Sequence, residues 1–145
     1  MLLPLVRRLG QALGLADRGE RRAISQFRTD RAPLSLAILF DVSGSMDVAA
    51  RMTAAKFAAH HLLSWLEEGR DEAALFSFDS RLHEVAPFTV DTRALQGALG
   101  EVDPFGATSL HDAIAETARK IHERSNTRRA IVVLTDGIDT ASRLT

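Results

Sequence analysis

The segment Leu34-Ser35-Leu36-Ala37-Ile38-Leu39-Phe40-Asp41-Val42-Ser43-Gly44-Ser45 places a carboxylate and two hydroxyls directly after an apolar run. The run predicts a buried β-strand over residues 34–40, because its length and its nearly unbroken apolar character suit a strand that is covered on both faces. Open α/β sheets bind ligands at the carboxyl ends of such strands. Aspartate and serine offer hard oxygen donors, which are the ligands that Mg²⁺ prefers. The segment therefore predicts a cation site at the end of a buried strand.

Two further loops supply oxygens. A second apolar run, residues 130–134, ends in Thr135-Asp136-Gly137, and the loop Phe105-Gly106-Ala107-Thr108-Ser109 presents a hydroxyl just before an expected helix. Two bare carboxylates on adjacent strand ends repel each other, and a divalent cation between them removes that repulsion. Neutral hydroxyls fill the remaining coordination positions without adding charge. The candidate metal ligands are Asp41, Ser43, Ser45, Thr108 and Asp136.

These three elements resemble the metal-ion-dependent adhesion site of a von Willebrand factor type A domain. The resemblance rests on Asp41-x-Ser43-x-Ser45, Thr108 and Asp136-Gly137, which recur in the family's order and beside the expected strands and helix. It covers roughly residue 33 to the end, and residues 33–46 are most similar to bacterial members. It implies that the serines bind Mg²⁺ directly, with Mn²⁺ or Ca²⁺ as alternatives. It also implies that both aspartates act largely through waters or as counter-charges, and that Thr108 changes between direct and water-mediated contact.

The resemblance implies a protein-binding module, used for adhesion or docking, and no catalytic residues. An open position on the ion would accept an Asp or Glu side chain from a protein partner. The rim that would contact this partner comprises Met46, Gly106, Ser109, His111 and Gly137. Two alternatives remain: a metal-assisted hydrolase and a fragment that has lost its function. The sequence argues against catalysis, because it has no Gly-x-Ser-x-Gly elbow and the motif places no histidine as a base for Ser43 or Ser45.

The rest of the chain predicts alternating strands and helices. The resemblance implies a Rossmann-like α/β fold: a doubly wound, mostly parallel sheet with one antiparallel edge strand and helices on both faces. Pro87 favours the edge position, because it removes a donor from the ladder. Ser109 is expected to cap a helix, Gly69 to end one, and Phe57 and Trp65 to lie in or near the core. The expected helices are 52–68, 92–99 and 110–121, and the other expected strands are 72–78 and 82–88.

Length and composition indicate one domain with a short extension. The chain has 145 residues and 46% hydrophobic content; residues 1–32 are expected to form a helical or irregular extension and residues 33–145 the type A domain. Only residues 137–145 follow Asp136, so the resemblance implies that the last strands of the sheet are missing. A longer parent protein, a second chain or the N-terminal segment could account for this flank. The first of these is the preferred expectation.

Charge and cysteine content exclude several classes of site. The net charge of −1 gives no reason to expect nucleic acid as a partner. No cysteine is present, which excludes disulfides and thiolate metal sites but leaves the compartment open. No run approaches the roughly 18 apolar residues of a membrane span. Arg7 and Arg8 follow the apolar start, which reverses the order of a signal peptide. Localisation and oligomeric state stay undetermined.

Overall fold

The structure, a computed structural model, describes residues 16–17, 20–21, 32–102, 108–137 and 142–143. The chain divides into two compact units, Met1–Arg31 and Ala32–Thr145. The described residues of the first unit form an antiparallel pair of short strands, β1 (Ala16–Asp17) and β2 (Glu20–Arg21). Residues 1–32 are expected to form a helical or irregular extension, and within it residues 16–17 and 20–21 are in strands. The remainder of that expectation lies outside the described residues.

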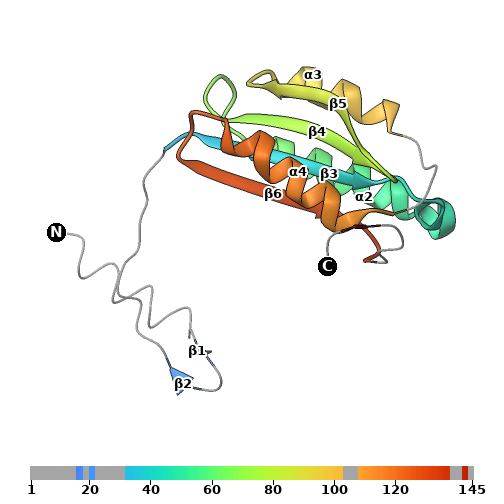
Figure 1. The fold of residues 1–145 in the computed structure, drawn as a ribbon. Helices are drawn as coiled ribbons and strands as arrows, with labels where there is room; N and C mark the ends of the chain where they lie inside the picture. Colours follow the sequence, from blue (N-terminus) through green and yellow to red (C-terminus); the bar gives the residue numbers. More distant parts are fainter. Residues whose placement is uncertain (1–15, 18–19, 22–31, 103–107, 138–141, 144–145) are drawn as a thin grey trace. The chain divides into compact units, whose positions relative to one another are not determined.

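The second unit is built on a four-stranded sheet with the order β5-β4-β3-β6 (Figure 1). Strand β3 (Leu34–Asp41) is central and pairs in parallel with β4 (Glu72–Phe78) and with β6 (Arg128–Leu134). Strand β5 (Leu82–Thr89) runs antiparallel to β4 at one edge. The predicted α/β fold, with a mostly parallel sheet and one antiparallel edge strand, is confirmed.

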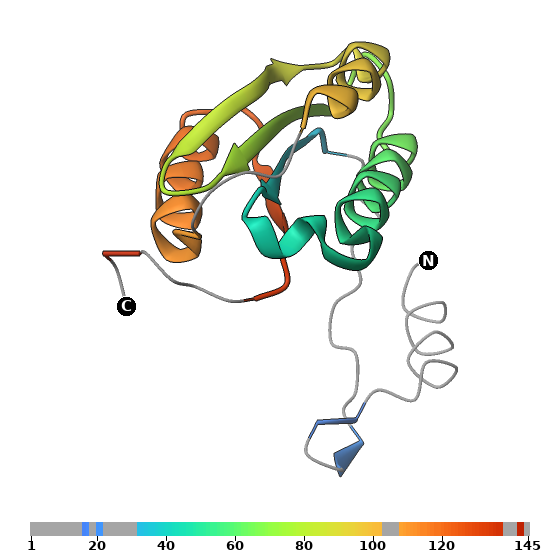
Figure 2. The same cartoon turned by 90° about the vertical axis from the view of Figure 1, so that its right-hand side faces the viewer.

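Helices cover both faces of this sheet (Figures 1 and 2). Helix α2 (Arg51–Ser64) and helix α3 (Thr92–Ala98) lie on one face, and α4 (Leu110–His122) lies on the other. Two 3₁₀ segments, η1 (Gly44–Ala50) and η2 (Leu99–Glu101), precede α2 and follow α3. Along β3, Ile38 and Phe40 pack toward α2, whereas Ala37 and Leu39 pack toward α4. This burial on both faces explains the unbroken apolar run. No helix in the described part of the chain is long and apolar enough to cross a membrane.

Helix α2 ends earlier than predicted. Its last residue is Ser64, and Gly69 lies in the following turn with φ 76° rather than at the helix end. The carboxylate of Asp71 accepts a hydrogen bond from the Glu67 amide at 3.0 Å, so this amide has a partner outside the helix. The other oxygen of Asp71 accepts from the Leu34 amide at 2.9 Å and ties the turn to the start of β3.

Phe57 of α2 and Trp65, the residue that follows α2, are exposed, contrary to the prediction that they lie in or near the core. Phe57 and Trp65 are 76% and 70% exposed, and they lie on either side of His61, with ring centroids 6.5 Å and 5.1 Å from it. Residues four apart share one face of a helix. The face that packs on the sheet is instead formed by Met52, Ala55, Ala59 and Leu63, which are all buried. Helical periodicity was therefore correct, but these aromatics belong to the outer face.

The edge strand β5 accommodates Pro87 at an irregular point of the ladder. Leu75 is paired with Ala86 and Ala73 with Thr89, so the register shifts between these pairs. A bulge leaves a residue without a partner in the ladder, which suits a proline that has no amide hydrogen. The edge-strand prediction from Pro87 therefore has a local structural reason.

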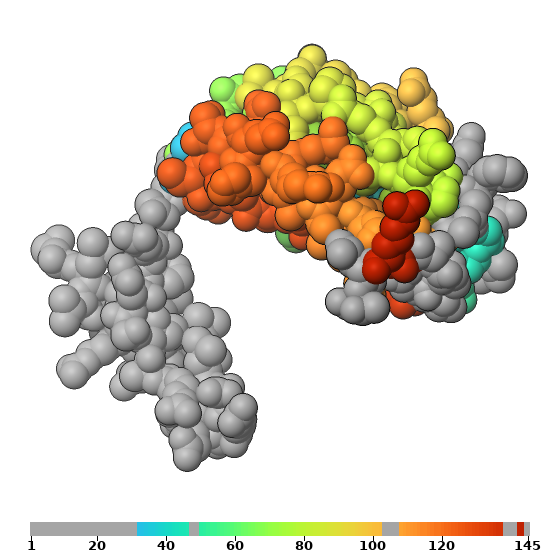
Figure 3. Space-filling model, in the orientation of Figure 1, coloured from blue at the N-terminus to red at the C-terminus, as the bar shows by residue number. Residues whose placement is uncertain are grey.

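The N-terminus of α4 is capped by a distant residue. Ser109 is the N-cap residue, as predicted, but its side chain makes no capping hydrogen bond. The hydroxyl of Ser142 accepts hydrogen bonds from the amides of His111, at 2.9 Å, and Asp112, at 3.3 Å. The Arg143 amide donates to the Asp112 carboxylate at 2.9 Å. Figure 3 shows residues 142–143, in dark red, beside α4.

Candidate metal site

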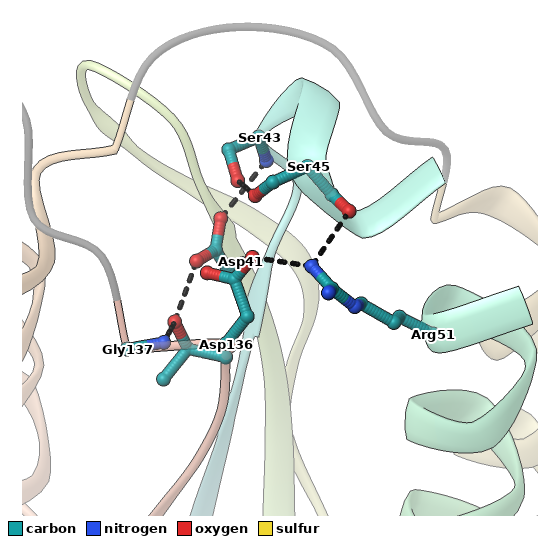
Figure 4. Close-up of polar contacts among 7 residues, drawn as sticks. Asp41, Ser43, Ser45, Arg51, Asp136 and Gly137 are labelled. Atoms are coloured by element: carbon teal, nitrogen blue, oxygen red, sulfur yellow. Dashed lines mark hydrogen bonds and ion pairs between the residues drawn. The ribbon is translucent and has the colours of Figure 1, made fainter. Parts of the chain in front are cut away.

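The candidate site lies at the carboxyl ends of two adjacent parallel strands. Phe40 of β3 is paired with Leu134 of β6, and Asp41 and Asp136 follow these two residues closely in sequence. The turn that leads into η1 and the start of η1 then place Ser43 and Ser45 beside Asp41 (Figure 4). The parallel register therefore brings together two carboxylates that are far apart in the sequence.

Asp41 is the buried centre of the site. Its side chain is 0% exposed; one carboxylate oxygen accepts from the Ser43 amide at 2.9 Å, and the other from the Thr135 hydroxyl at 2.6 Å. Both donors are neutral, and Asp41 forms no ion pair with any residue that the structure describes. A buried carboxylate is costly unless a positive charge lies nearby. The environment of Asp41 therefore favours a cation close to it.

The hydroxyls of Ser43 and Ser45 have a spacing that suits an octahedral ion. Their Oγ atoms are 2.9 Å apart and hydrogen-bonded to each other. Two oxygens at neighbouring octahedral positions, each about 2.1 Å from Mg²⁺, are separated by about 3.0 Å. The pair therefore needs little rearrangement to offer two adjacent ligands. The backbone bond from the Ser43 amide to Asp41 holds this turn against the end of the strand.

Asp136 forms an ion pair that the sequence analysis did not anticipate. A terminal guanidinium nitrogen of Arg51 lies 2.9 Å from Asp136 Oδ2 and 3.3 Å from the Ser45 carbonyl oxygen (Figure 4). The Asp136 side chain is 11% exposed and that of Arg51 is 47% exposed. Arg51 is the first residue of α2, so the end of η1 fixes where it enters the site. A basic residue at the start of the helix after the serine turn was the available sequence signal.

Thr135 is a second residue that the sequence analysis missed. Its hydroxyl donates to Asp41 and accepts from the Gly137 amide at 3.0 Å. The Thr135 side chain therefore links Asp41, at the end of β3, to the turn that follows β6. Gly137 has φ 87°, a conformation that glycine adopts readily, so the turn after Asp136 requires it. The position of a hydroxyl residue at the end of β6 was the signal that could have identified Thr135.

Thr108 lies at the same edge of the sheet, next to the residue that follows β4. Thr108 is 3% exposed, and the amide of the following Ser109 donates to the Asp79 carbonyl oxygen at 2.8 Å. Asp79 directly follows β4, the other neighbour of β3, so this contact places Thr108 at the carboxyl edge of the sheet. The loop before α4 therefore lies at the same edge of the sheet as the ends of β3 and β4.

The predicted partner rim is only partly on the surface. His111 and Gly137 are exposed, whereas Met46 and Ser109 are each 3% exposed. Met46 belongs to the core on the α2 face, and Ser109 is held by its backbone contact to Asp79. These two residues are therefore buried rather than exposed at the rim. Gly106 lies outside the described residues.

Asp79 adopts the geometry of a turn residue. Its carboxylate accepts from the Arg81 amide at 2.8 Å, the Ser80 hydroxyl at 3.2 Å and His83 Nε2 at 3.3 Å. Burial raises the pKa of Asp79, but these three donors together outweigh it and leave the pKa below its ordinary value. Its donors belong to its own turn, so Asp79 stabilises the start of the β4–β5 connection.

The donor set decides what kind of ion fits. In the described part of the chain, no group of three or more His, Cys, Asp or Glu side chains is arranged to hold a metal. The site offers hydroxyls and two carboxylates, one of them fully buried and bound by protein donors. Such a set excludes soft metals that need thiolates and suits a hard ion that retains several waters. Mg²⁺ is an ion of that kind.

Comparison with known proteins assigns the fold to a family. Residues 36–138 match the family model described as the von Willebrand factor type A domain. Among curated proteins, no match was found.

Solved bacterial structures share the fold. The von Willebrand factor domain of the type V pili tip protein Mfa5 from Porphyromonas gingivalis is 21% identical, with a TM-score of 0.67 over 75% of this chain and 39% of that one. The PilB minor pilin from Streptococcus sanguinis is 19% identical, with a TM-score of 0.68 over 85% of this chain and 35% of that one. An aerotolerance-related membrane protein from Bacteroides fragilis is 27% identical, with a TM-score of 0.65 over 74% of this chain and 56% of that one. The chain thus spans less than two thirds of each of these structures.

Proposed function

The chain belongs to the von Willebrand factor type A domain family, and we propose that it is a protein-binding module whose site uses a divalent cation to engage an acidic side chain of a partner. The similarity to a pilus tip protein and a minor pilin supports a role in protein interaction. Mg²⁺ is the proposed ion, held by Ser43 and Ser45, with Thr108 as a further proposed ligand and Asp41 and Asp136 as counter-charges.

One observation carries the proposal: the carboxylate of Asp41 is completely buried and bonded only to neutral donors, beside two hydroxyls at ligand spacing. A structural aspartate in a turn needs neither the burial nor the second hydroxyl. Both features suit a cation site, because the buried charge attracts the ion and the hydroxyls can bind it.

The residues of the site have separate roles in this proposal. Asp41 is fixed by the Ser43 amide and the Thr135 hydroxyl, so its charge stays in place with little reorganisation. Ser43 and Ser45 present neutral oxygens and leave the charge of the ion largely uncompensated. When bound, the ion supplies a positive centre that can accept a carboxylate oxygen. An Asp or Glu of the partner is therefore the matching chemical group.

Catalysis is the weaker alternative. The hydroxyl of Ser43 is bonded to that of Ser45, and neither hydroxyl contacts an imidazole among the residues that the structure describes. A nucleophilic serine needs a base within hydrogen-bond reach. This arrangement supports binding rather than nucleophilic attack.

The first prediction tests the ion site by titration calorimetry with Mg²⁺ and then Mn²⁺. Wild-type protein should give saturable one-to-one binding, and Asp41→Asn should abolish it. Asparagine keeps the shape of the side chain and an oxygen that can accept from the Ser43 amide, but it removes the charge that attracts the ion. Ser43→Ala should weaken binding less, because it removes one neutral ligand.

Asp91→Asn is the matched control. Asp91 caps α3 through the amides of Arg93 and Ala94, and asparagine is an equally good cap, so ion binding should be unchanged. Circular dichroism confirms that each variant is folded. An absence of ion binding in folded wild-type protein, or equal losses in Asp41→Asn and Ser43→Ala, would contradict the roles assigned here. If the proposal holds, capture of a protein partner from solution should depend on Mg²⁺ and be reversed by a chelator.

A further inference from the structure

The ion pair between Arg51 and Asp136 joins a protein cation to a carboxylate of the proposed metal site. The guanidinium nitrogen lies 2.9 Å from Asp136 Oδ2, while Asp41 has only neutral partners among the described residues. The same nitrogen contacts the carbonyl oxygen of Ser45, whose hydroxyl is a proposed ligand. Arg51 therefore contacts both Asp136, which follows β6, and Ser45 in the turn after β3.

From this geometry we infer that Arg51 is an internal competitor of the divalent cation for Asp136 and thereby sets the affinity of the site. This inference rests on the proposed ion-binding function. The Arg51–Asp136 pair lowers the negative charge that the site offers to an ion. When a divalent ion binds, either the positive guanidinium repels it or the ion displaces the guanidinium from Asp136.

The surroundings allow Arg51 to leave Asp136. The Arg51 side chain is 47% exposed, so its charge can be solvated once the pair is broken. A cavity of about 400 Å³ lies beside the pair, between α2 and the end of β6; Ala54, Ala58 and Leu134 line it together with Arg51 and Asp136. Small side chains on this side of α2 leave room for a long side chain to move.

The energetic balance makes the competition measurable. An ion pair whose cationic partner is half exposed contributes little to stability, so breaking this one costs the fold little. A unit positive charge a few ångströms from a divalent ion lowers the affinity of the ion by on the order of tenfold even in a water-like dielectric. Arg51 therefore affects ion affinity more than it affects folding.

The second prediction is that Arg51→Met binds Mg²⁺ and Mn²⁺ about tenfold more tightly than wild-type protein in titration calorimetry. Methionine preserves helix propensity and an apolar stem but removes the charge. Arg51→Lys should stay close to wild type, because it keeps the positive charge. The rise in melting temperature on adding Mg²⁺ should be larger for Arg51→Met than for wild type, which gives a readout independent of calorimetric heat.

Arg70→Met is the matched control. Arg70 forms a 2.8 Å ion pair with Glu67, and it precedes β4, so it lies at the opposite end of the sheet from Asp41. The substitution changes the net charge by the same amount but should leave ion affinity unchanged. A double-mutant cycle with Asp136→Asn adds a second test: the gain from Arg51→Met should shrink when Asp136 has lost its charge.

The outcomes separate the inference from the function on which it rests. Equal ion affinity in wild type and Arg51→Met, or weaker binding in the variant, would overturn the competitor role while the ion site stands. Binding that appears only in Arg51→Met would support the competitor role of Arg51 and contradict the proposed function of the wild-type protein. If no folded variant binds either ion, the proposed function fails and the inference fails with it.

Discussion

At the residue scale, Ala50 has a conformation that alanine rarely adopts. It precedes α2 with φ 59° and ψ 24°, in the left-handed region, whereas the other positive φ angles among the described residues belong to Gly69 and Gly137. The 3₁₀ segment that carries the serines must turn into α2 at this point. Ala50 therefore stores backbone strain next to the site, where the direction of the chain determines the position of Arg51.

The third prediction is that Ala50→Gly raises the free energy of unfolding by about 0.5 kcal/mol. Relief of about 1–2 kcal/mol of left-handed strain is partly offset by the greater freedom of glycine in the unfolded chain. Urea unfolding measures the change. Ala54→Gly is the control, because Ala54 is exposed within α2 and glycine there should destabilise by about 1 kcal/mol. Destabilisation by both substitutions would argue against strain at position 50.

At the element scale, the α4 cap shows that a helix terminus can be completed from outside its own segment. The first amides of a helix need acceptors, and Ser109 has the right residue type in the right place. The acceptor is nevertheless Ser142, which reaches two of these amides. The described C-terminal residues are thus held to the same helix that begins after Thr108.

The fourth prediction concerns this cap. Ser142→Ala should lower the free energy of unfolding by about 1 kcal/mol, because two amides at the start of α4 lose their acceptor. Ser109→Ala should cost less, since the Ser109 side chain makes no capping bond. Thermal unfolding followed by circular dichroism measures both variants. A larger loss for Ser109→Ala would contradict the assigned cap.

At the scale of the whole molecule, a polar network lies at the amino ends of the strands. The candidate site lies at the other end of the same sheet, at the carboxyl ends. Glu72 of β4 accepts from the Ser35 hydroxyl of β3 at 2.6 Å and from two nitrogens of Arg124 at 3.0 and 2.7 Å. Arg124 follows α4 in the chain, so the network ties two central strands to the α4–β6 connection. The hydrogen bond from Arg124 is the main cause that lowers the pKa of Glu72, against the effect of burial.

The fifth prediction follows from that pKa. Because the folded-state pKa of Glu72 lies below its ordinary value of 4.5, its contribution to stability is complete above that value and is lost as the pH falls through the lower folded-state pKa. Glu72→Gln should lower the free energy of unfolding at pH 7 by about 2 kcal/mol and reduce its acid dependence. Unfolding curves between pH 3 and pH 7 measure both effects.

Glu67→Gln provides the control for this experiment. Glu67 also pairs with an arginine, Arg70, at 2.8 Å, but its side chain is 60% exposed. Loss of an exposed pair should change stability by less than about 1 kcal/mol at pH 7. If the two substitutions have equal effects, the Glu72 network has no special role in holding the strands together.

Much of the fold was predictable because its determinants are local. The apolar runs of β3 and β6, the boundaries of β4 and the period of α4 all follow from neighbouring residues. The candidate ligands were also visible, because a strand end followed by hydroxyls is a short sequence feature. Asp41, Ser43 and Ser45 lie together for that reason.

Other features depended on residues far apart in the chain. Phe57 and Trp65 have the helical spacing of core residues, but α2 packs on the sheet through the face that carries Ala55 and Ala59 instead. The Glu67 amide beyond the end of α2 is bonded by Asp71, and two amides at the start of α4 are bonded by Ser142. A local pattern gives residue types and periods, but it does not contain these partners.

The sequence by itself determined the strands, the helices and the oxygen-rich turn after Asp41, because backbone propensity and apolar periodicity act over a few residues. Only the tertiary structure decided that Thr135 bonds to Asp41 and that Arg51 pairs with Asp136. These contacts exist because the parallel register of β3 and β6 aligns their carboxyl ends and because η1 turns the chain back over them. The charge balance of the site is therefore a property of the assembled sheet rather than of any one motif.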